Sequence, residues 1–167
     1  MSMTNIESVL HESRKFAPPA AFTAAARIQP ADFAALRAEA ERDYVAYWGR
    51  LASEELRWHV PFSRILDDSK APNFRWFTDG EINASFNCLD IHLGVRGDKP
   101  AIIFVAEHGD SRTLTYRQLT AEVCQLANAL KSLGVWPGDR VVIYMPMVPE
   151  AVIAMQACAR IGATHSV

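Results

Sequence analysis

VVIYMPMVPEAVIAMQACARIGATHSV, residues 141–167, decides the fold class of this chain. An apolar, β-branched run ends at Pro146 and Pro149, a stretch with helical spacing follows, and a second short run begins after Gly162. Pro149 suits the first turn of a helix, where its missing N–H costs nothing, and Gly162 suits a helix end. Strand, helix and strand within this length predict a right-handed βαβ unit with parallel strands.

The strand expected at 140–145 is apolar at nearly every position, and the helix that follows has only a narrow polar edge. Such runs are typical of parallel strands that are covered on both faces. Open sheets of this kind bind ligands at the carboxyl ends of their strands, so the strand expected at 163–167 leads to a ligand-binding edge. We interpret the C-terminal half as α/β, the first part of a doubly wound, mainly parallel sheet.

The stretch just upstream predicts a hairpin and then a helix. An apolar run at 101–106, a turn at 108–110 and a second run at 111–115 have the spacing of two antiparallel strands. Thr115 then stands three residues before Gln118, which is the spacing of a capping box at a helix start. Gly134 suits the end of that helix.

The first hundred residues predict a helical cap segment in front of the sheet. Residues 31–56 have apolar positions at helical spacing, and Gly49 is expected to break this helix into two pieces. Residues 58–76 predict short extended segments, and 83–94 predict another helix. The expected division is an arm at 1–29, the cap segment at 30–97 and a second domain from 98 to 167. Four aromatic residues are interpreted as anchors that pack the N-terminal arm against the main body: Trp48, Trp58, Phe74 and Trp76.

Composition excludes several classes of partner. The chain has 167 residues, half of them hydrophobic, and a net charge of −2 with both signs mixed, so nucleic acid and anionic membranes are not expected partners. The cysteines Cys88, Cys124 and Cys158 form no CxxC pair, which argues against zinc and favours reduced, buried thiols. No signal pattern and no long uninterrupted apolar run is present, so we expect a cytoplasmic protein.

No motif in the sequence assigns an active site. GxxxxGK[ST], GxGxxG, GxSxG and HExxH are all absent. His165 and Ser166 are strand neighbours whose side chains point to opposite faces, and Asp90 and His92 do not face each other at an i, i+2 spacing.

The remaining polar candidates have structural interpretations. Glu150 suits a helix start, where a carboxylate favours the dipole. Residues 96–98 are typical of a turn, and the acceptor pattern at 83–85 is attributed to chance without a secretory signal. We therefore assign no catalytic, cofactor-binding or metal-binding residue.

Two motifs nevertheless carry a family resemblance. Residues 74–93, FRWFTDGEINASFNCLDIHL, contain W-F-x-x-G-x-x-N followed by N-C-L-D-x-H. With YMPMVPEAVIAMQACARIGATHSV at 144–167, this stretch resembles the AMP-forming acetyl-CoA synthetase family. The intervening residues 114–141 resemble adenylate-forming enzymes in general. The resemblance covers residues 30–167 and implies the family's cap segment and the start of its AMP-binding domain.

The resemblance implies a two-step ligation in which acetate and ATP form acetyl-adenylate, and coenzyme A then takes the acetyl group, with magnesium as the metal. The family's phosphate loop, ribose-binding aspartate, hinge and C-terminal lysine are not in this sequence, so no site residue is carried over. We expect an N-terminal fragment that is inactive alone and binds no cofactor. We also expect it either to associate with itself through an exposed strand edge or to have a poorly ordered C-terminus. Two alternatives stay open: a propionyl-CoA synthetase fragment, or a natural non-catalytic binding or regulatory half-domain.

Overall fold

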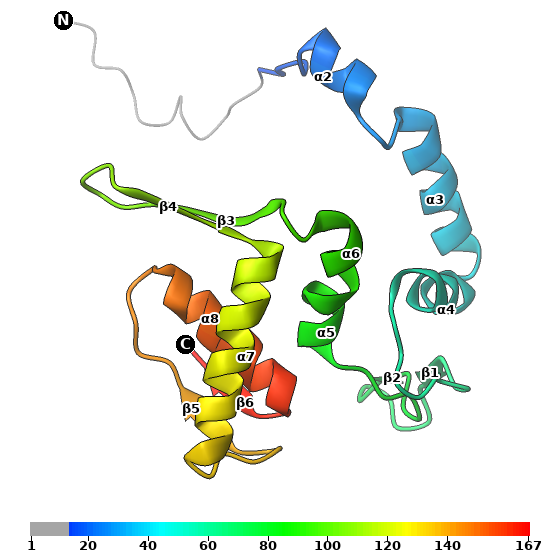
Figure 1. Cartoon of the computed structure of the whole chain (residues 1–167). Helices are drawn as coiled ribbons and strands as arrows, with labels where there is room; N and C mark the ends of the chain where they lie inside the picture. Colours follow the sequence, from blue (N-terminus) through cyan, green and yellow to red (C-terminus); the bar gives the residue numbers. More distant parts are fainter. Residues whose placement is uncertain (1–13) are drawn as a thin grey trace, which may run out of the picture. The chain divides into compact units, whose positions relative to one another are not determined.

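The computed structural model describes residues 14–167, which divide into two units after Tyr44. The first unit contains α2 (Ala20–Ala25) and α3 (Pro30–Arg42) (Figure 1). Neither helix has a buried residue. Pro30 opens α3, and the Asp32 carboxylate accepts a hydrogen bond of 3.0 Å from the Gln29 N–H, which completes a capping box.

The break in the expected helix 31–56 lies at Asp43 and not at Gly49. Asp43 is extended, with φ −155° and ψ 90°, and separates α3 from α4 (Tyr44–Glu55). Gly49 is buried inside α4 because the Ile65 side chain packs over it: an added Cβ would lie 2.4 Å from Ile65 Cδ1. The glycine provides room for a neighbouring side chain, and the prediction of a break at Gly49 was wrong.

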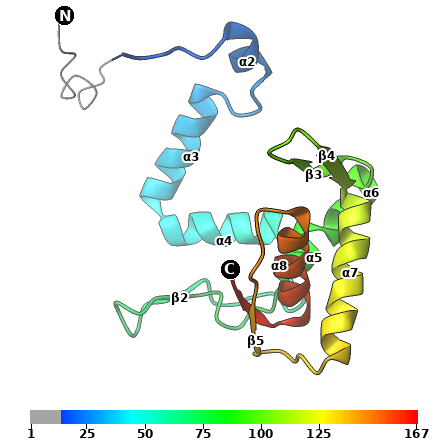
Figure 2. The same cartoon turned by 90° about the vertical axis from the view of Figure 1, so that its left-hand side faces the viewer.

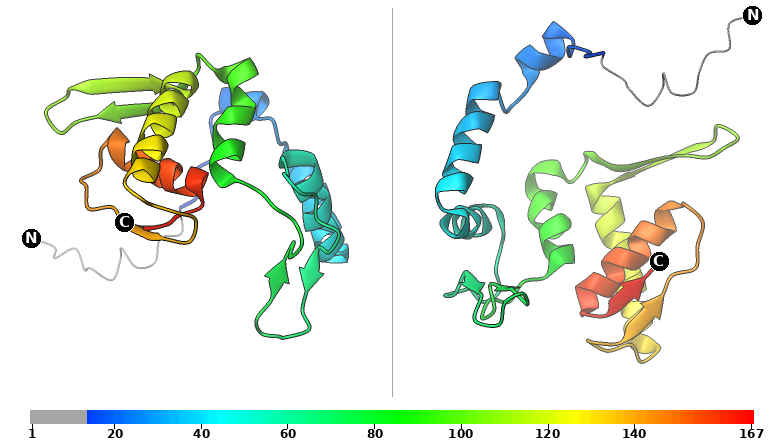
Figure 3. Two further views of the ribbon diagram at one scale, coloured as in Figure 1. Left: turned by 60° about the horizontal axis from the view of Figure 1, so that its bottom comes forward. Right: turned by 180° about the vertical axis from the view of Figure 1, so that it is seen from behind.

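An aromatic cluster organises the segment after α4. The strands β1 (Leu66–Asp67) and β2 (Arg75–Trp76) form a short antiparallel pair (Figure 3). Near it, the ring centroid of Trp58 lies 5.0 Å from that of Phe62 and 5.4 Å from that of Phe77. The Trp58 indole N–H donates to the Ala52 carbonyl at 2.8 Å, which fastens the cluster to the end of α4.

Three short helices and a hairpin follow. The helices are α5 (Ala84–Cys88), the 3-10 helix η1 (Asp90–His92) and α6 (Leu93–Arg96). The strands β3 (Pro100–Val105) and β4 (Ser111–Thr115) pair antiparallel around a turn in which Gly109 has a φ of 90°. The predicted hairpin is confirmed.

Helix α7 (Tyr116–Ser132) begins at the predicted capping box. Thr115 Oγ1 accepts a hydrogen bond from the Gln118 N–H at 3.2 Å, and Gln118 Oε1 accepts one from the Thr115 N–H at 2.9 Å. Gly134 follows with a φ of 86°, a conformation that glycine adopts at little cost.

The βαβ unit is confirmed. Strands β5 (Arg140–Val142) and β6 (Thr164–Ser166) pair in parallel, with α8 (Pro149–Ile161) between them in sequence. Figure 2 shows α7 and α8 side by side, and the two helices are in contact. Strand β5 is shorter than the expected 140–145. Within residues 14–167 the strands form three separate two-stranded sheets, and Val142 is exposed, so this sheet has cover on one face only.

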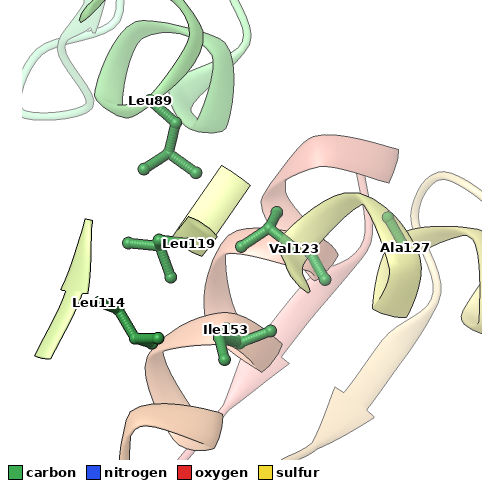
Figure 4. Close-up of a cluster of buried hydrophobic side chains, with 7 residues drawn as sticks. Leu89, Leu114, Leu119, Val123, Ala127 and Ile153 are labelled. Atoms are coloured by element: carbon green, nitrogen blue, oxygen red, sulfur yellow. The ribbon is translucent and has the colours of Figure 1, made fainter. Parts of the chain in front are cut away.

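One apolar core joins these elements (Figure 4). Leu89, between α5 and η1, packs with Leu114 of β4 and with a stripe along α7. Ile153 and Ala157 of α8 complete the cluster from the other side. Because α8 is fixed on α7 in this way, the turn at Gly162 and strand β6 are fixed with it.

Candidate functional site

The carboxyl ends of β5 and β6 lie at one edge of their small sheet. Val141 pairs in register with His165 and Val142 with Ser166, and the Ile143 N–H donates to the Ser166 carbonyl at 2.8 Å. His165 is half-buried and Ser166 is exposed, and within residues 14–167 neither side chain forms a hydrogen bond. These two side chains therefore form no acid–base pair.

Glu150, in the first turn of α8, and Arg112 of β4 form a charged bridge. The Arg112 guanidinium donates to Glu150 at 2.5 Å and to both carboxylate oxygens of Glu122 at 3.1 and 3.2 Å. Backbone hydrogen bonding at the start of α8, and then Arg112, lower the pKa of Glu150. The Glu150 contact in turn raises the pKa of Arg112. Each charge has a partner, so the bridge ties β4 to α7 and α8 and leaves its guanidinium already neutralised.

Asn83, the last residue of the W-F-x-x-G-x-x-N motif, joins two helix ends. Its Oδ1 accepts a hydrogen bond from the Phe86 N–H at 3.0 Å and so caps the start of α5. Its Nδ2 donates to the carbonyl oxygens of Ala159 and Arg160, at 3.2 and 3.0 Å, at the end of α8. Carbonyls in a last helical turn have no partner four residues further on in the helix. The Asn83 amide bonds two of them, alongside the Gly162 N–H that donates to the Ala159 carbonyl at 3.3 Å, so one side chain joins both helices.

Asn87 opens the N-C-L-D-x-H motif and holds a different segment. Its Oδ1 accepts a hydrogen bond from the Arg57 N–H at 2.7 Å, and its Nδ2 donates to the Arg57 carbonyl at 2.9 Å. The side chain thus pairs with the backbone of Arg57 as a neighbouring strand would. This contact fastens the chain after α4 to α5.

Asp90 of the same motif pairs with Arg160 of α8. Arg160 Nη1 donates to one Asp90 carboxylate oxygen at 3.3 Å, Nη2 bonds the other, and both side chains are largely buried. His92 packs edge-on against Tyr116 with ring centroids 5.7 Å apart, so Asp90 and His92 do not act together. No spacing in the sequence indicated the Arg160 partner, because it lies seventy residues away.

Asp79 and Gly80 have structural roles as well. The Asp79 carboxylate accepts hydrogen bonds from the Ser63 hydroxyl, the Ser63 N–H and the Arg64 N–H. The Ser63 hydroxyl is the largest cause that lowers the pKa of Asp79 to about 2. Gly80 lies against the Trp58 ring, where an added Cβ would meet carbon atoms at 2.7 Å. The motif residues therefore act as a packing and hydrogen-bonding centre.

A cavity of about 710 Å³ lies near the ends of α7 and α8, and Cys124, Lys131, Trp136 and Arg160 are among its lining residues. The cysteines differ in exposure: Cys158 is buried, Cys124 is half-buried and Cys88 is exposed, so the expectation of three buried thiols was wrong for Cys88. Burial raises the pKa of the Cys158 thiol.

Residues 14–167 contain neither a cluster that could bind a metal ion nor a helix that could span a membrane. No cluster of three or more histidine, cysteine, aspartate or glutamate side chains there could hold a metal ion. None of the helices there is both long and apolar enough to cross a membrane.

Two family models match adjoining parts of the chain. Residues 33–88 match the acetyl-coenzyme A synthetase N-terminus, and residues 89–167 match the AMP-binding enzyme family. The chain belongs to the acetyl-coenzyme A synthetase family of AMP-binding enzymes. The resemblance inferred from the two motifs is thereby confirmed.

Relatives with similar sequences align along almost the whole chain. An acetyl-coenzyme A synthetase of Ralstonia nicotianae is 59% identical over 167 residues, which are 99% of this chain and 25% of the relative. An enzyme of the same name from Thiobacillus denitrificans is 57% identical over 166 residues, with the same coverage. The chain thus spans about a quarter of the length of the curated relatives it matches.

A solved structure shows the same fold. Acetoacetyl-CoA synthetase from Streptomyces lividans matches 89% of this chain and 25% of its own, with a TM-score of 0.73 and 29% sequence identity. This match confirms the predicted α/β class.

Proposed function

We propose that the chain is the N-terminal region of an AMP-forming acetate–CoA ligase. The reaction is ATP, acetate and coenzyme A to acetyl-CoA, AMP and diphosphate through acetyl-adenylate. The observation that carries the proposal is the identity of 57–59% with acetyl-coenzyme A synthetases along 99% of the chain. The adjoining family matches at 33–88 and 89–167 support the same order of segments.

The chemistry explains why such an enzyme needs more groups than these residues provide. A carboxylate is a poor acyl donor until one of its oxygens becomes part of a good leaving group, which adenylation achieves. Magnesium and cationic side chains would neutralise the phosphates during that transfer. Within residues 14–167 no cluster fits a metal ion, and Arg112 of β4 is already paired, so no reaction step is assigned to this chain's own side chains.

In this proposal, the chain forms the structural framework that positions strand β6. Asn83 and Asp90 hold two of the cap helices, α5 and η1, to α8. Helix α8 in turn sets where β6 begins and where its carboxyl end lies. We keep the division into an arm at 1–29, a cap segment at 30–97 and an AMP-binding domain from 98 as part of this proposal, together with a cytoplasmic location.

The test compares two proteins, the 167-residue chain and a chain extended to the length of its relatives. We expect acetate-dependent exchange of pyrophosphate into ATP with the long protein and none with the short one. In calorimetry, we expect no saturable heat of binding when ATP or acetate is added to the short protein. Acetyl-adenylate formed by residues 1–167 alone would overturn the scaffold assignment. If the long protein prefers propionate to acetate, the chain is instead the N-terminal region of a propionyl-CoA ligase.

We also propose that the isolated chain associates with itself at the β5–β6 sheet. The support is that each of these strands has one hydrogen-bonded neighbour within residues 14–167, and that apolar side chains around them are exposed. Unpaired strand edges and uncovered apolar faces favour association.

A further inference from the structure

A second cavity, of about 440 Å³, lies where the segment after α4 meets α5 and the end of α8. Its lining residues are Arg57, Trp58, His59, Asn83, Phe86 and Arg160. All of them belong to the unit formed by residues 45–167. The volume falls within the range of roughly 300–1,000 Å³ that is typical of small-molecule sites.

Arg57 gives this cavity a positive charge that no acidic side chain neutralises. Its Nη1 reaches only the Glu54 carbonyl, at 3.5 Å, and within residues 14–167 its guanidinium pairs with no carboxylate. Arg160 lines the same cavity but is paired with Asp90. Arg57 is held in place by its backbone, because Asn87 bonds both its N–H and its carbonyl. An unpaired guanidinium on an anchored backbone, beside the exposed His59, favours an anion.

Two aromatic side chains form apolar walls beside that charge. Trp58 is immobilised by its contacts with Phe62 and Phe77 and by its bond to Ala52. Phe86, in the first turn of α5, is 45% exposed and also lines the cavity. Asn83 contributes no free donor, because both of its amide hydrogens and its oxygen serve the helix ends.

We propose that this cavity binds a small organic anion that carries a flat ring. Arg57 binds the anionic group, and Trp58 and Phe86 enclose the ring. The site lies at the end of α8 opposite to the carboxyl edge of β5 and β6, so it is separate from the edge where adenylation would take place. The inference does not depend on the proposed ligase activity.

Phenyl phosphate is a suitable probe, because it joins a dianion to a phenyl ring. We expect saturable shifts of the backbone amide signals around Arg57 and Phe86 when it is titrated into the 15N-labelled 167-residue chain. Inorganic phosphate and phenol, which each supply one half of the probe, are expected to bind more weakly than the joined molecule. Phenyl phosphate that fails to saturate at any accessible concentration overturns the proposal.

Two variants and a control locate the site. Arg57→Gln is expected to weaken phenyl phosphate binding about tenfold, the loss of one charge-assisted contact, and Phe86→Leu to weaken phenyl phosphate but not inorganic phosphate. Arg140→Gln is the control, because Arg140 is exposed, lies on β5 and forms no ion pair within residues 14–167. Equal losses in Arg57→Gln and Arg140→Gln would show general charge attraction and contradict the site. Amide spectra of the free variants check that each is folded.

The same titration on a chain of the relatives' length decides whether the cavity is open in the whole protein. Retained binding, again lost in Arg57→Gln, supports the proposal. Loss of binding in the longer protein would mean that another part of the polypeptide occupies the cavity, and the proposal would be wrong. Neither result changes with the outcome of the pyrophosphate-exchange assay, which reports on ATP and acetate alone.

Discussion

Gly162 sets the turn between α8 and β6 with a φ of 76°, a conformation that favours glycine. An added Cβ there would also lie 3.3 Å from Pro137 Cβ. We expect Gly162→Ala to lower the free energy of unfolding by about 1 kcal/mol, measured from urea transitions. Gly94→Ala is the matched control, because nothing lies within 4 Å of its added Cβ and its φ is not positive. Equal effects of the two changes would contradict the assignment of strain to Gly162.

The lowered pKa of Asp79 predicts that the stability of the fold depends on pH. Its pKa is about 2 in the folded protein, lowered from 3.8 chiefly by the Ser63 hydroxyl. A folded pKa below the unfolded value stabilises the fold at pH above the unfolded value, and this contribution is lost as pH falls through 4 toward 2. We expect Asp79→Asn to have a lower Tm than the parent at pH 7, with the difference shrinking over that interval.

Thermal unfolding followed by circular dichroism between pH 7 and pH 2 measures this difference. Asp68→Asn is the control, because the Asp68 carboxylate accepts no hydrogen bond within residues 14–167. It removes the same charge and should leave Tm almost unchanged at every pH. If the difference in Tm between Asp79→Asn and the parent stays constant down to pH 2, the ionised Asp79 carboxylate is not the cause of that difference.

At the scale of elements, Asn83 is a cap for two helices, and one substitution separates its two roles. Asn83→Asp keeps an oxygen that accepts from the Phe86 N–H, but it replaces the donor facing Ala159 and Arg160 with a second oxygen. A carboxylate against carbonyls at the negative end of α8 is repelled. We expect a loss of about 1–3 kcal/mol in the free energy of unfolding, the usual range for buried groups left unpaired.

Urea unfolding measures that loss, and amide exchange at Ala163 and Thr164 should quicken because the end of α8 is released. Asn128→Asp is the matched control: it places the same charge near the end of α7, where the Asn128 side chain forms no hydrogen bond within residues 14–167. If the two variants lose equal stability, the effect is one of charge near a helix end and the cap on α8 is not responsible.

Sequence patterns predicted helix starts and ends correctly, because caps and turns depend on residues that are close together in the chain. The interval from Thr115 to Gln118 indicated the capping box, and Pro149 and Gly162 bounded α8 correctly. The prediction for Gly49 was wrong because a glycine is needed there to make room for Ile65, a side chain from another segment. Chain spacing gives no access to such contacts, so a glycine that makes room and a glycine that breaks a helix look alike in sequence.

For the whole molecule, the limits of sequence reasoning lie in long-range pairs. The spacing showed only that Asp90 does not face His92, and the structure pairs Asp90 with Arg160 in a different helix. The apolar positions at helical spacing in 31–56 predicted helix correctly, but they do not show what covers it: α3 has no buried residue within the described structure. The motif at 76–92 was recognised as characteristic of a family, while its work of joining α5, α8 and the chain after α4 became visible only in three dimensions.

The surface near β5 and β6 gives the prediction at the scale of the molecule. Val142, Tyr144, Met147 and Val167 are 79%, 100%, 92% and 73% exposed. Sedimentation velocity over about 10 to 200 µM should show the 167-residue chain shifting from monomer to larger species, and Val142→Lys should suppress the shift, because a charge on an edge strand opposes pairing. Val95→Lys, at a site that is 90% exposed on α6, adds the same charge elsewhere and should not. A monomer at every concentration, with the amides of 163–167 protected from exchange, would show that this face needs no partner.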